Sequence, residues 1–350
     1  MNQLAKLLLS THVNSLIKSK GSKKSQLITL TADATIRTAL MTFVEQDISA
    51  IPIRSGASNG DTEFLGMFNI TDILRYILKD SPESFYKQDI STLLNRPISA
   101  VIKECGIRKV KIISGQLSLM RLLFDQWHNV SRSCYDEVDI KHLLVNCGAG
   151  RYEVITPTDL LRYVLLLSRE NGYLRDAKAC EIPCGLMTDE SKTVSGEDDA
   201  WFAFKKLLDA GPVYVLAVVD RETGRLEANL SAIDFLPASL ALSSTSTALE
   251  KSISLEDAIS MLRRPGLSLY AFVRAIKPFR SSSDFDPICL QPHFSLADLI
   301  EKMAKMKIHQ LWRVSQDRAR TPVGIVGICD VIKHFCKIFE PYKDASDFIE

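Results

Sequence analysis

One arrangement recurs four times in this chain: a short apolar segment, a break, and an aspartate that opens a second apolar segment. The recurring aspartates are Asp72, Asp159, Asp234 and Asp330. After three of them, apolar residues follow at positions +1, +2, +5 and +6, which is the spacing of one buried helix face. Each copy therefore predicts a strand that leads directly into a helix. The helix after Asp234 is expected to be short, because Pro237 and Ser239 interrupt its pattern.

The junctions close larger units with the predicted order strand, helix, strand, strand, helix. In the first unit a helix is expected over residues 34–46, because its apolar residues share one face. The corresponding helices of the third and fourth units are expected to begin at capping boxes, Ser195–Asp198 and Ser295–Asp298. The predicted strands are residues 27–30, 50–53, 64–68, 110–113, 142–146, 152–155, 213–219, 225–230, 311–314 and 323–328.

The units determine the predicted domain organisation. A unit with one sheet and two helices is too small to bury its own apolar faces, so four units imply two packed pairs. A chain of 350 residues is long enough for two such domains, each with its own core. The predicted divisions are an N-terminal helix and linker (1–26), repeat 1 (27–80), repeat 2 with its preceding linker (81–168), repeat 3 (180–241), a linker containing a helix at 254–264 (242–286), repeat 4 (287–340) and a C-terminal tail (341–350).

Composition and charge limit the classes of partner. The 43 Lys and Arg residues nearly balance the 42 Asp and Glu residues, so the net charge of +1 does not favour nucleic acid or an anionic membrane. No apolar run approaches the roughly 20 residues of a membrane-spanning helix. The basic segment 4–24 fits either a targeting peptide or, more simply, a helix ahead of the first strand.

Cysteine usage and the missing motifs bear on compartment and chemistry. Eight cysteines stand singly, which is typical of reduced, buried thiols in a protein of the cytoplasm or nucleus. Nucleophile-elbow, phosphate-loop and zinc-protease motifs are missing, and Cys329, His334 and Cys336 lack metal-ligand spacing. The chain is therefore predicted not to be an enzyme and to hold no metal.

The order of elements, the strand-to-helix junction with its aspartate, and the four copies together resemble the CBS domain family, whose repeats pair into Bateman modules. The resemblance covers nearly the whole chain and implies an α/β fold of four repeats in two modules. Among four-repeat proteins the chain resembles most the regulatory γ subunits of AMP-activated protein kinase. The stretch 306–314, MKIHQLWRV, is similar to the sequence ahead of their second strand.

In that family, clefts between paired repeats bind adenosine nucleotides, so the resemblance implies AMP, ADP or ATP as regulatory ligands. The family aspartate holds the ribose hydroxyls, a role that the resemblance assigns to Asp72, Asp159, Asp234 and Asp330. A Ser or Thr three residues earlier assists. Repeats 2 and 3 keep this hydroxyl as Thr156 and Ser231, whereas repeats 1 and 4 have Asn69 and Gly327.

Basic residues that face a shared central cavity hold phosphate in that family. The matching residues are His309 in repeat 4 and Lys141 and His142 in repeat 2. The corresponding pairs in repeats 1 and 3, residues 49–50 and 212–213, carry no charge. We therefore expect nucleotide in repeats 2 and 4 rather than in repeats 1 and 3.

The aspartates also have an explanation without a ligand. The segments Thr156–Asp159 and Ser231–Asp234 are capping boxes, in which the aspartate accepts hydrogen bonds from backbone N–H groups at the helix start. Four helix starts would explain four aspartates. The nearby basic residues favour the binding hypothesis for Asp159 and Asp330, while the short helix predicted after Asp234 makes that residue the least important.

Two functions follow from these alternatives. The first is a non-enzymatic regulatory protein that binds adenine nucleotides in one or two clefts and modulates a protein partner. The resemblance implies the catalytic and scaffold subunits of a kinase complex as that partner. The second is a ligand-free scaffold of CBS repeats, in which the aspartates only cap helices.

Overall fold

The computed structural model describes most of the chain: residues 3–21, 27–55, 63–79, 89–128, 138–168, 173–183, 192–210, 215–236, 253–276, 287–306, 308–317 and 320–343. Pro237 and residues 212–213 of the sequence analysis lie outside these ranges.

Repeat 1 has the predicted order of elements. Its sheet has the order β1-β2-β3, with β1 (Leu30–Thr31) parallel to β2 (Ala50–Arg54) and β2 antiparallel to β3 (Phe64–Asn69). Helix α3 (Ile36–Glu45) connects β1 to β2, and α4 (Ile70–Ile77) follows β3. The face of α3 predicted from its periodicity is buried: Ile36, Ala39, Leu40, Phe43 and Val44.

Repeats 2 to 4 vary this plan. Repeats 2 and 3 again have three-stranded sheets, and repeat 4 has two strands plus an isolated bridge from Cys289 to Trp312 in place of the first strand. Their strands are β4 (Lys109–Ser114), β5 (Val138–Asn146), β6 (Tyr152–Ile155), β7 (Thr193–Ser195), β8 (Val215–Val219), β9 (Leu226–Ser231), β10 (Gln310–Val314) and β11 (Pro322–Gly327). Their helices are α8 (Leu119–Arg121) with the π-helical η1 (Leu122–His128), α9 (Pro157–Leu167), α11 (Ala200–Asp209), η5 (Ala232–Phe235), α14 (Leu296–Met306) and α15 (Ile328–Phe339).

Two predicted features of repeat 3 have different outcomes. The short helix after β9 is confirmed, because η5 is a single 3-10 segment of four residues. The predicted start of α11 is wrong. Asp198 accepts a hydrogen bond from the backbone of Ser195 and closes a turn, while the helix begins at Ala200 with Asp199 as its N-cap.

The segments between repeats contain more helix than the sequence indicated. The predicted N-terminal helix is a pair, α1 (Gln3–Ser10) and α2 (Val13–Ser19). The helix expected at 254–264 is present as α12. Helix α12 spans Leu255–Leu262. The other helices of these segments were not predicted: α6 (Ile90–Leu94), α7 (Ile98–Cys105), α10 (Tyr173–Asp176), η3 (Ala179–Glu181), α13 (Leu269–Ile276) and η8 (Glu340–Tyr342).

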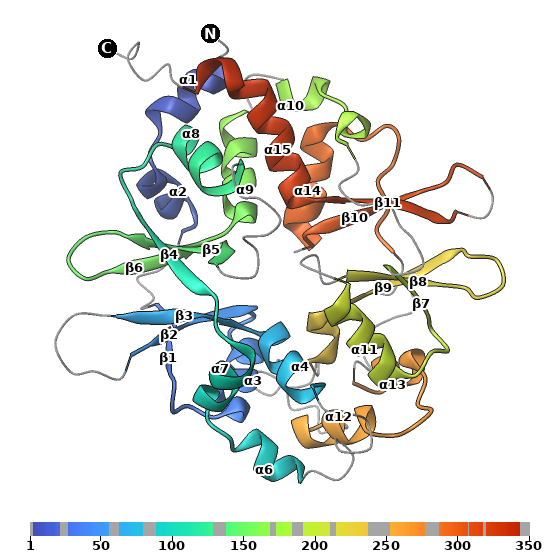
Figure 1. The fold of residues 1–350 in the computed structure, drawn as a ribbon. Helices are drawn as coiled ribbons and strands as arrows, with labels where there is room; N and C mark the ends of the chain where they lie inside the picture. Colours follow the sequence, from blue (N-terminus) through green and yellow to red (C-terminus); the bar gives the residue numbers. More distant parts are fainter. Residues whose placement is uncertain are drawn as a thin grey trace, which may run out of the picture.

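The helices form two layers, each with its own hydrophobic core (Figure 1). The lower layer combines α3, α4, α6 and α7 of the first half of the chain with α11, α12, α13 and η5 of the second half. The upper layer combines α1, α2, α8, η1 and α9 with α14 and α15. Repeat 1 therefore shares a core with repeat 3, and repeat 2 with repeat 4.

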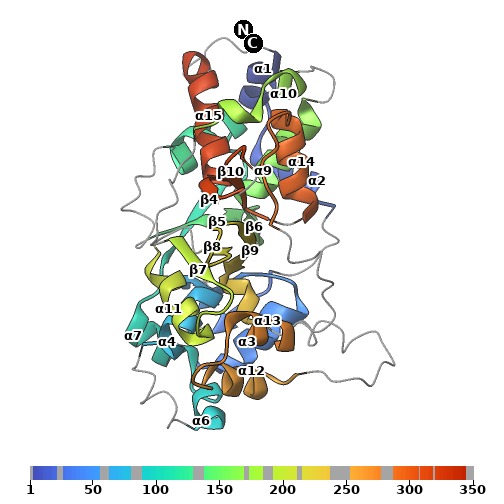
Figure 2. The same cartoon turned by 90° about the vertical axis from the view of Figure 1, so that its right-hand side faces the viewer.

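The sheets lie between the helical layers and join the repeats in the other combination (Figure 2). The backbone N–H of Met67 in β3 donates to the carbonyl of Arg108 at 2.9 Å, which joins repeat 1 to repeat 2. A third apolar cluster joins the sheets of repeats 3 and 4: Val215, Ala217, Leu226, Cys289, Trp312 and Ile325. Two domains with separate cores were expected. The two cores are present, but each combines one repeat from each half of the chain, whereas the sheets join repeats within the same half.

Candidate functional site

At all four junctions the aspartate caps the helix that it opens. In each case Oδ2 accepts a hydrogen bond from the backbone N–H three residues earlier, at 2.8–2.9 Å. The donors are the N–H groups of Asn69, Thr156, Ser231 and Gly327. The capping role that the sequence left open is therefore present at every junction, and it uses one carboxylate oxygen of each aspartate.

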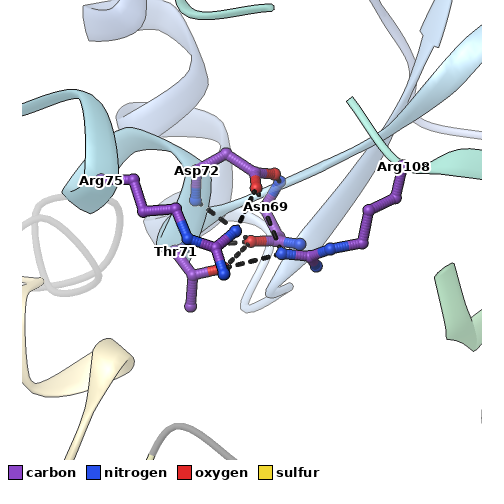
Figure 3. A network of polar contacts seen from close by, with 5 residues as sticks. All are labelled: Asn69, Thr71, Asp72, Arg75 and Arg108. Carbon is purple, nitrogen blue, oxygen red and sulfur yellow. Dashed lines mark hydrogen bonds and ion pairs between the residues drawn. The ribbon is translucent and has the colours of Figure 1, made fainter. Parts of the chain in front are cut away.

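The repeat 1 junction holds an arginine from the start of repeat 2 (Figure 3). The Arg108 guanidinium lies 3.3 Å from Oδ1 of Asp72 and 3.4 Å from the hydroxyl of Thr71, while Arg75 approaches the same oxygen at 3.7 Å. The side-chain carbonyl of Asn69 accepts from the N–H of Thr71 at 3.0 Å. Asn69, Thr71 and Asp72 are buried, so the guanidinium satisfies a carboxylate that has little access to water.

The backbone around Arg108 is held as firmly as its side chain. Gly66 of β3 passes so close to this segment that a Cβ there would lie 2.6 Å from the Arg108 carbonyl oxygen and 2.6 Å from Cγ1 of Ile107. Only glycine fits this crossing without a shift of the neighbouring backbone. Arg108 is therefore held in the repeat 1 junction by contacts of both its backbone and its guanidinium.

The repeat 2 junction also carries a cation from elsewhere in the chain. Nζ of Lys20, at the end of α2, lies 3.0 Å from Oδ2 of Asp159 and 2.9 Å from the carbonyl oxygen of Val154. The hydroxyl of Thr156 donates to the same Oδ2 at 2.9 Å. The neighbouring Thr158 hydroxyl is buried and has no hydrogen-bond partner among the described residues.

The repeat 3 junction is closed by its own residues. The Ser231 hydroxyl donates to Oδ2 of Asp234 at 2.8 Å, and Asp234 is buried. The residue paired with Ser231 across the sheet is Val215, as Ala50 is paired with Asn69 and Gln310 with Gly327. In repeat 3 the position equivalent to the second residue of the basic pair is therefore Val215, two positions after the residue 213 that the sequence indicated. Val215 carries no charge.

The repeat 4 junction differs in its N-cap. Gly327 offers no hydroxyl to Asp330, which is only partly buried. The strand partner of Gly327 is Gln310, and the carbonyl of His309 accepts the N–H of Ile328 at 2.9 Å. The backbone of His309 is thus hydrogen-bonded to the first residue of the helix that Asp330 caps.

Lys141 and His142 lie in a bulge of β5. The pairing of β4 with β5 passes from Val110 opposite Asp139 directly to Lys111 opposite Leu143, which leaves residues 140–142 outside the ladder. A bulge of this kind bends a strand and redirects its side chains, and such bulges are frequent beside functional sites. Both basic side chains are partly buried at this position.

The structure brings the basic residues of repeats 2 and 4 together. The pKa of His309 is lowered to about 4, first by desolvation and then by the nearby charges of Lys141 and His142. His309 as a whole residue is nevertheless exposed, so solvent or a solute can reach this position. An anion beside these three groups would relieve their mutual repulsion.

The cysteines of the described residues are all free thiols. Cys336 is buried, and burial raises the pKa of its thiol to about 12. The expectation of buried thiols is confirmed at Cys289 and Cys336, whereas Cys105, Cys147 and Cys329 are partly buried and Cys180 is exposed. No group of three or more His, Cys, Asp or Glu side chains in the described ranges is arranged to hold a metal ion.

Comparisons with known proteins agree with this architecture. Residues 23–79 and 282–337 match the CBS domain family, and these segments correspond to repeats 1 and 4. These two segments make the chain similar to the CBS domain family at the positions of repeats 1 and 4, in agreement with the resemblance seen in its sequence. A search of the curated proteins found no match.

Among solved structures, the fold is similar to that of protein MJ1225 from Methanocaldococcus jannaschii, proposed as an archaeal homologue of γ-AMPK. The TM-score is 0.55 at 17% sequence identity, over 93% of this chain and 100% of that chain. An uncharacterized conserved protein from Pyrococcus horikoshii gives a TM-score of 0.46 at 16% identity, over 93% of this chain and 99% of that one. The similarity to MJ1225 confirms the predicted fold class across the repeats that the family match does not reach. Within the described residues, no helix is both long and apolar enough to cross a membrane.

The sequence analysis missed the two cations that occupy junctions. Arg108 is 36 residues from Asp72, and Lys20 is 139 residues from Asp159. Neither stands at a spacing that would indicate contact, so no local pattern identifies them. Both come from segments that were predicted only as linkers.

Proposed function

We propose that this protein is a regulatory subunit that binds an adenine nucleotide at the repeat 4 junction and passes its ligand state to a protein partner. The observation that carries the proposal is the cluster of Lys141, His142 and His309 beside the helix that Asp330 caps. In this arrangement Asp330 accepts the ribose hydroxyls and the cluster holds the phosphates.

The chemistry of the cluster suits a phosphate group. The pKa of His309 is lowered first by desolvation and then by the charges of Lys141 and His142, so these three side chains form a region of positive charge. A phosphate accepts hydrogen bonds from all three and offsets this charge. Each charge-assisted hydrogen bond contributes about 1.5–3 kcal/mol, so the loss of one should weaken binding roughly tenfold to a hundredfold.

Calorimetric titration of the full chain with AMP, ADP, ATP and S-adenosylmethionine tests the proposal. We expect Asp330→Asn and His309→Ala each to weaken nucleotide binding at least tenfold. The matched control is Asp298→Asn, because Asp298 also caps a helix of repeat 4, accepting the N–H of Ser295 at 2.9 Å, but lies at the start of α14. If Asp330→Asn and Asp298→Asn weaken nucleotide binding equally, Asp330 acts only as a helix cap and does not contact the nucleotide.

The second candidate is a ligand-free scaffold, which one specific observation favours. All four junction aspartates accept their own N-cap N–H, and those of repeats 1 and 2 also pair with Arg108 and Lys20. A scaffold predicts no thermal stabilisation by any of these ligands at millimolar concentration, whereas a nucleotide sensor gains stability as ligand binds the folded state.

The partner belongs to the same proposal. A nucleotide can shift a partner only to the extent that it binds one arrangement of the repeats more tightly than another. The catalytic and scaffold subunits of a kinase complex are the partners that the family resemblance favours. Purification of the native complex, with identification of its other chains, tests this directly.

A further inference from the structure

The contact between Lys20 and Asp159 has the chemistry of an occupied binding site. The ammonium group donates to Oδ2 of Asp159 at 3.0 Å and to the Val154 carbonyl at 2.9 Å. A cis-diol also presents two hydroxyl donors and would use the same two acceptors. Beside them, the buried hydroxyl of Thr158 has no hydrogen-bond partner among the described residues. The repeat 2 junction thus offers a ligand more polar groups than Lys20 satisfies.

The corresponding groups of repeat 1 are all used. Thr71 and Asp72 occupy the positions of Thr158 and Asp159, and the Arg108 guanidinium contacts both the hydroxyl of Thr71 and the carboxylate of Asp72. In the first pair of repeats, each junction is therefore occupied by a cation from the segment that precedes the other repeat. The two occupants differ in how completely they fill their sites.

The two occupants also differ in how easily they can leave. The Arg108 side chain is 11% exposed, and its backbone is fixed against β3. The Lys20 side chain is 34% exposed and lies at the end of α2, where it can swing into solvent without any movement of the helix. The helices need not move, because α1 and α2 bury Leu4, Leu8, Val13 and Leu16 in the upper core.

We propose that Lys20 is a side-chain gate over a second nucleotide site at the repeat 2 junction. The inference rests on the proposed function, because it takes the ligand to be the same adenine nucleotide. With Lys20 in place, a nucleotide must break an ion pair and a hydrogen bond before its ribose can reach Asp159. While Lys20 stays in place, repeat 2 remains closed and the chain binds nucleotide only at the repeat 4 junction.

The test is the stoichiometry of AMP binding to the full chain by calorimetry. Wild type should bind one AMP, and Lys20→Ala should bind two. The matched control, Lys18→Ala, removes an exposed lysine from the last turn of the same helix and should still bind one. Adding Asp159→Asn to Lys20→Ala should remove the gained site, while adding Asp330→Asn should leave only that site.

Each outcome separates the gate from the proposed function. One AMP bound by both wild type and a folded Lys20→Ala variant overturns the gate and leaves the repeat 4 site standing. No binding by wild type with one AMP bound by Lys20→Ala supports the gate and overturns the repeat 4 site. No binding by either protein overturns both. Near-ultraviolet circular dichroism and the melting temperature verify that Lys20→Ala is folded.

Discussion

Removal of the Arg108 side chain should destabilise the protein by about 3 kcal/mol. The substitution Arg108→Ala leaves Asp72 buried without its principal cation, and breaking a buried ion pair from one side costs about 3–5 kcal/mol. We expect the lower end of this range, because Arg75 remains 3.7 Å from the same oxygen and the N–H of Asn69 still donates to the other.

Urea unfolding of the full chain, followed by circular dichroism, measures this loss. The control is Arg221→Ala, which removes an ion pair to Asp198 in which the arginine side chain is 68% exposed, and which should cost less than about 1 kcal/mol. Millimolar methylguanidinium should restore part of the stability of Arg108→Ala and leave Arg221→Ala unchanged. A loss below about 1 kcal/mol for Arg108→Ala, with no restoration by methylguanidinium, would refute the reasoning.

Three further predictions concern close packing, protonation and the shared cores. Gly66→Ala should lower the free energy of unfolding in urea by about 1–3 kcal/mol, because its Cβ would collide with the backbone at Arg108. Gly327→Ser should instead raise it by a few tenths of a kcal/mol, because it supplies the N-cap hydroxyl that Gly327 lacks. Equal effects of the two substitutions would contradict this geometry. His309 is neutral near neutral pH in the free protein, because its pKa is about 4, so a bound phosphate that raises this pKa should cause proton uptake. AMP binding should therefore tighten as the pH falls from about 7 to about 5. Titrations in buffers of different ionisation enthalpy measure the proton uptake, and the same uptake in His309→Gln would exclude His309 as its source. A chain divided between residues 183 and 192 should give halves that self-associate or fail to fold, because each exposes part of both cores, and a monomeric half with dispersed amide resonances would contradict this.

The local elements could be read from the sequence because their signals are local. The periodicity that predicted the buried face of α3 extends over ten residues, and the Asp234 helix was expected to be short from Pro237 and Ser239 within its own pattern. Helices α7 and α13 were missed although each carries an apolar face, because they lie in segments that the repeat pattern assigned to linkers. Element type was thus clearest where the repeat gave each segment an equivalent elsewhere in the chain.

The site was predicted only in part, for a physical reason. The recurring aspartates mark the junctions correctly, but capping and ligand binding require the same residue at the same place, so the sequence could not separate them. The approach of His309 to Lys141 and His142 depends on how repeats 2 and 4 pack, and the contact of Arg108 with Asp72 depends on where the segment at residues 107–108 passes Gly66 of β3. These contacts join distant parts of the chain and leave no periodic trace.

The bulge in β5 has a consequence for how such a protein can change over time. Because residues 140–142 lie outside the ladder with β4, substitutions at Lys141 and His142 need not alter the pairing of Leu143–Asn146 with β4. Under the proposed function, the ligand preference of the cluster can therefore change through substitutions at Lys141 and His142 while the β4–β5 ladder stays the same. Relatives with the same sheets and different residues here would be expected to respond to different metabolites.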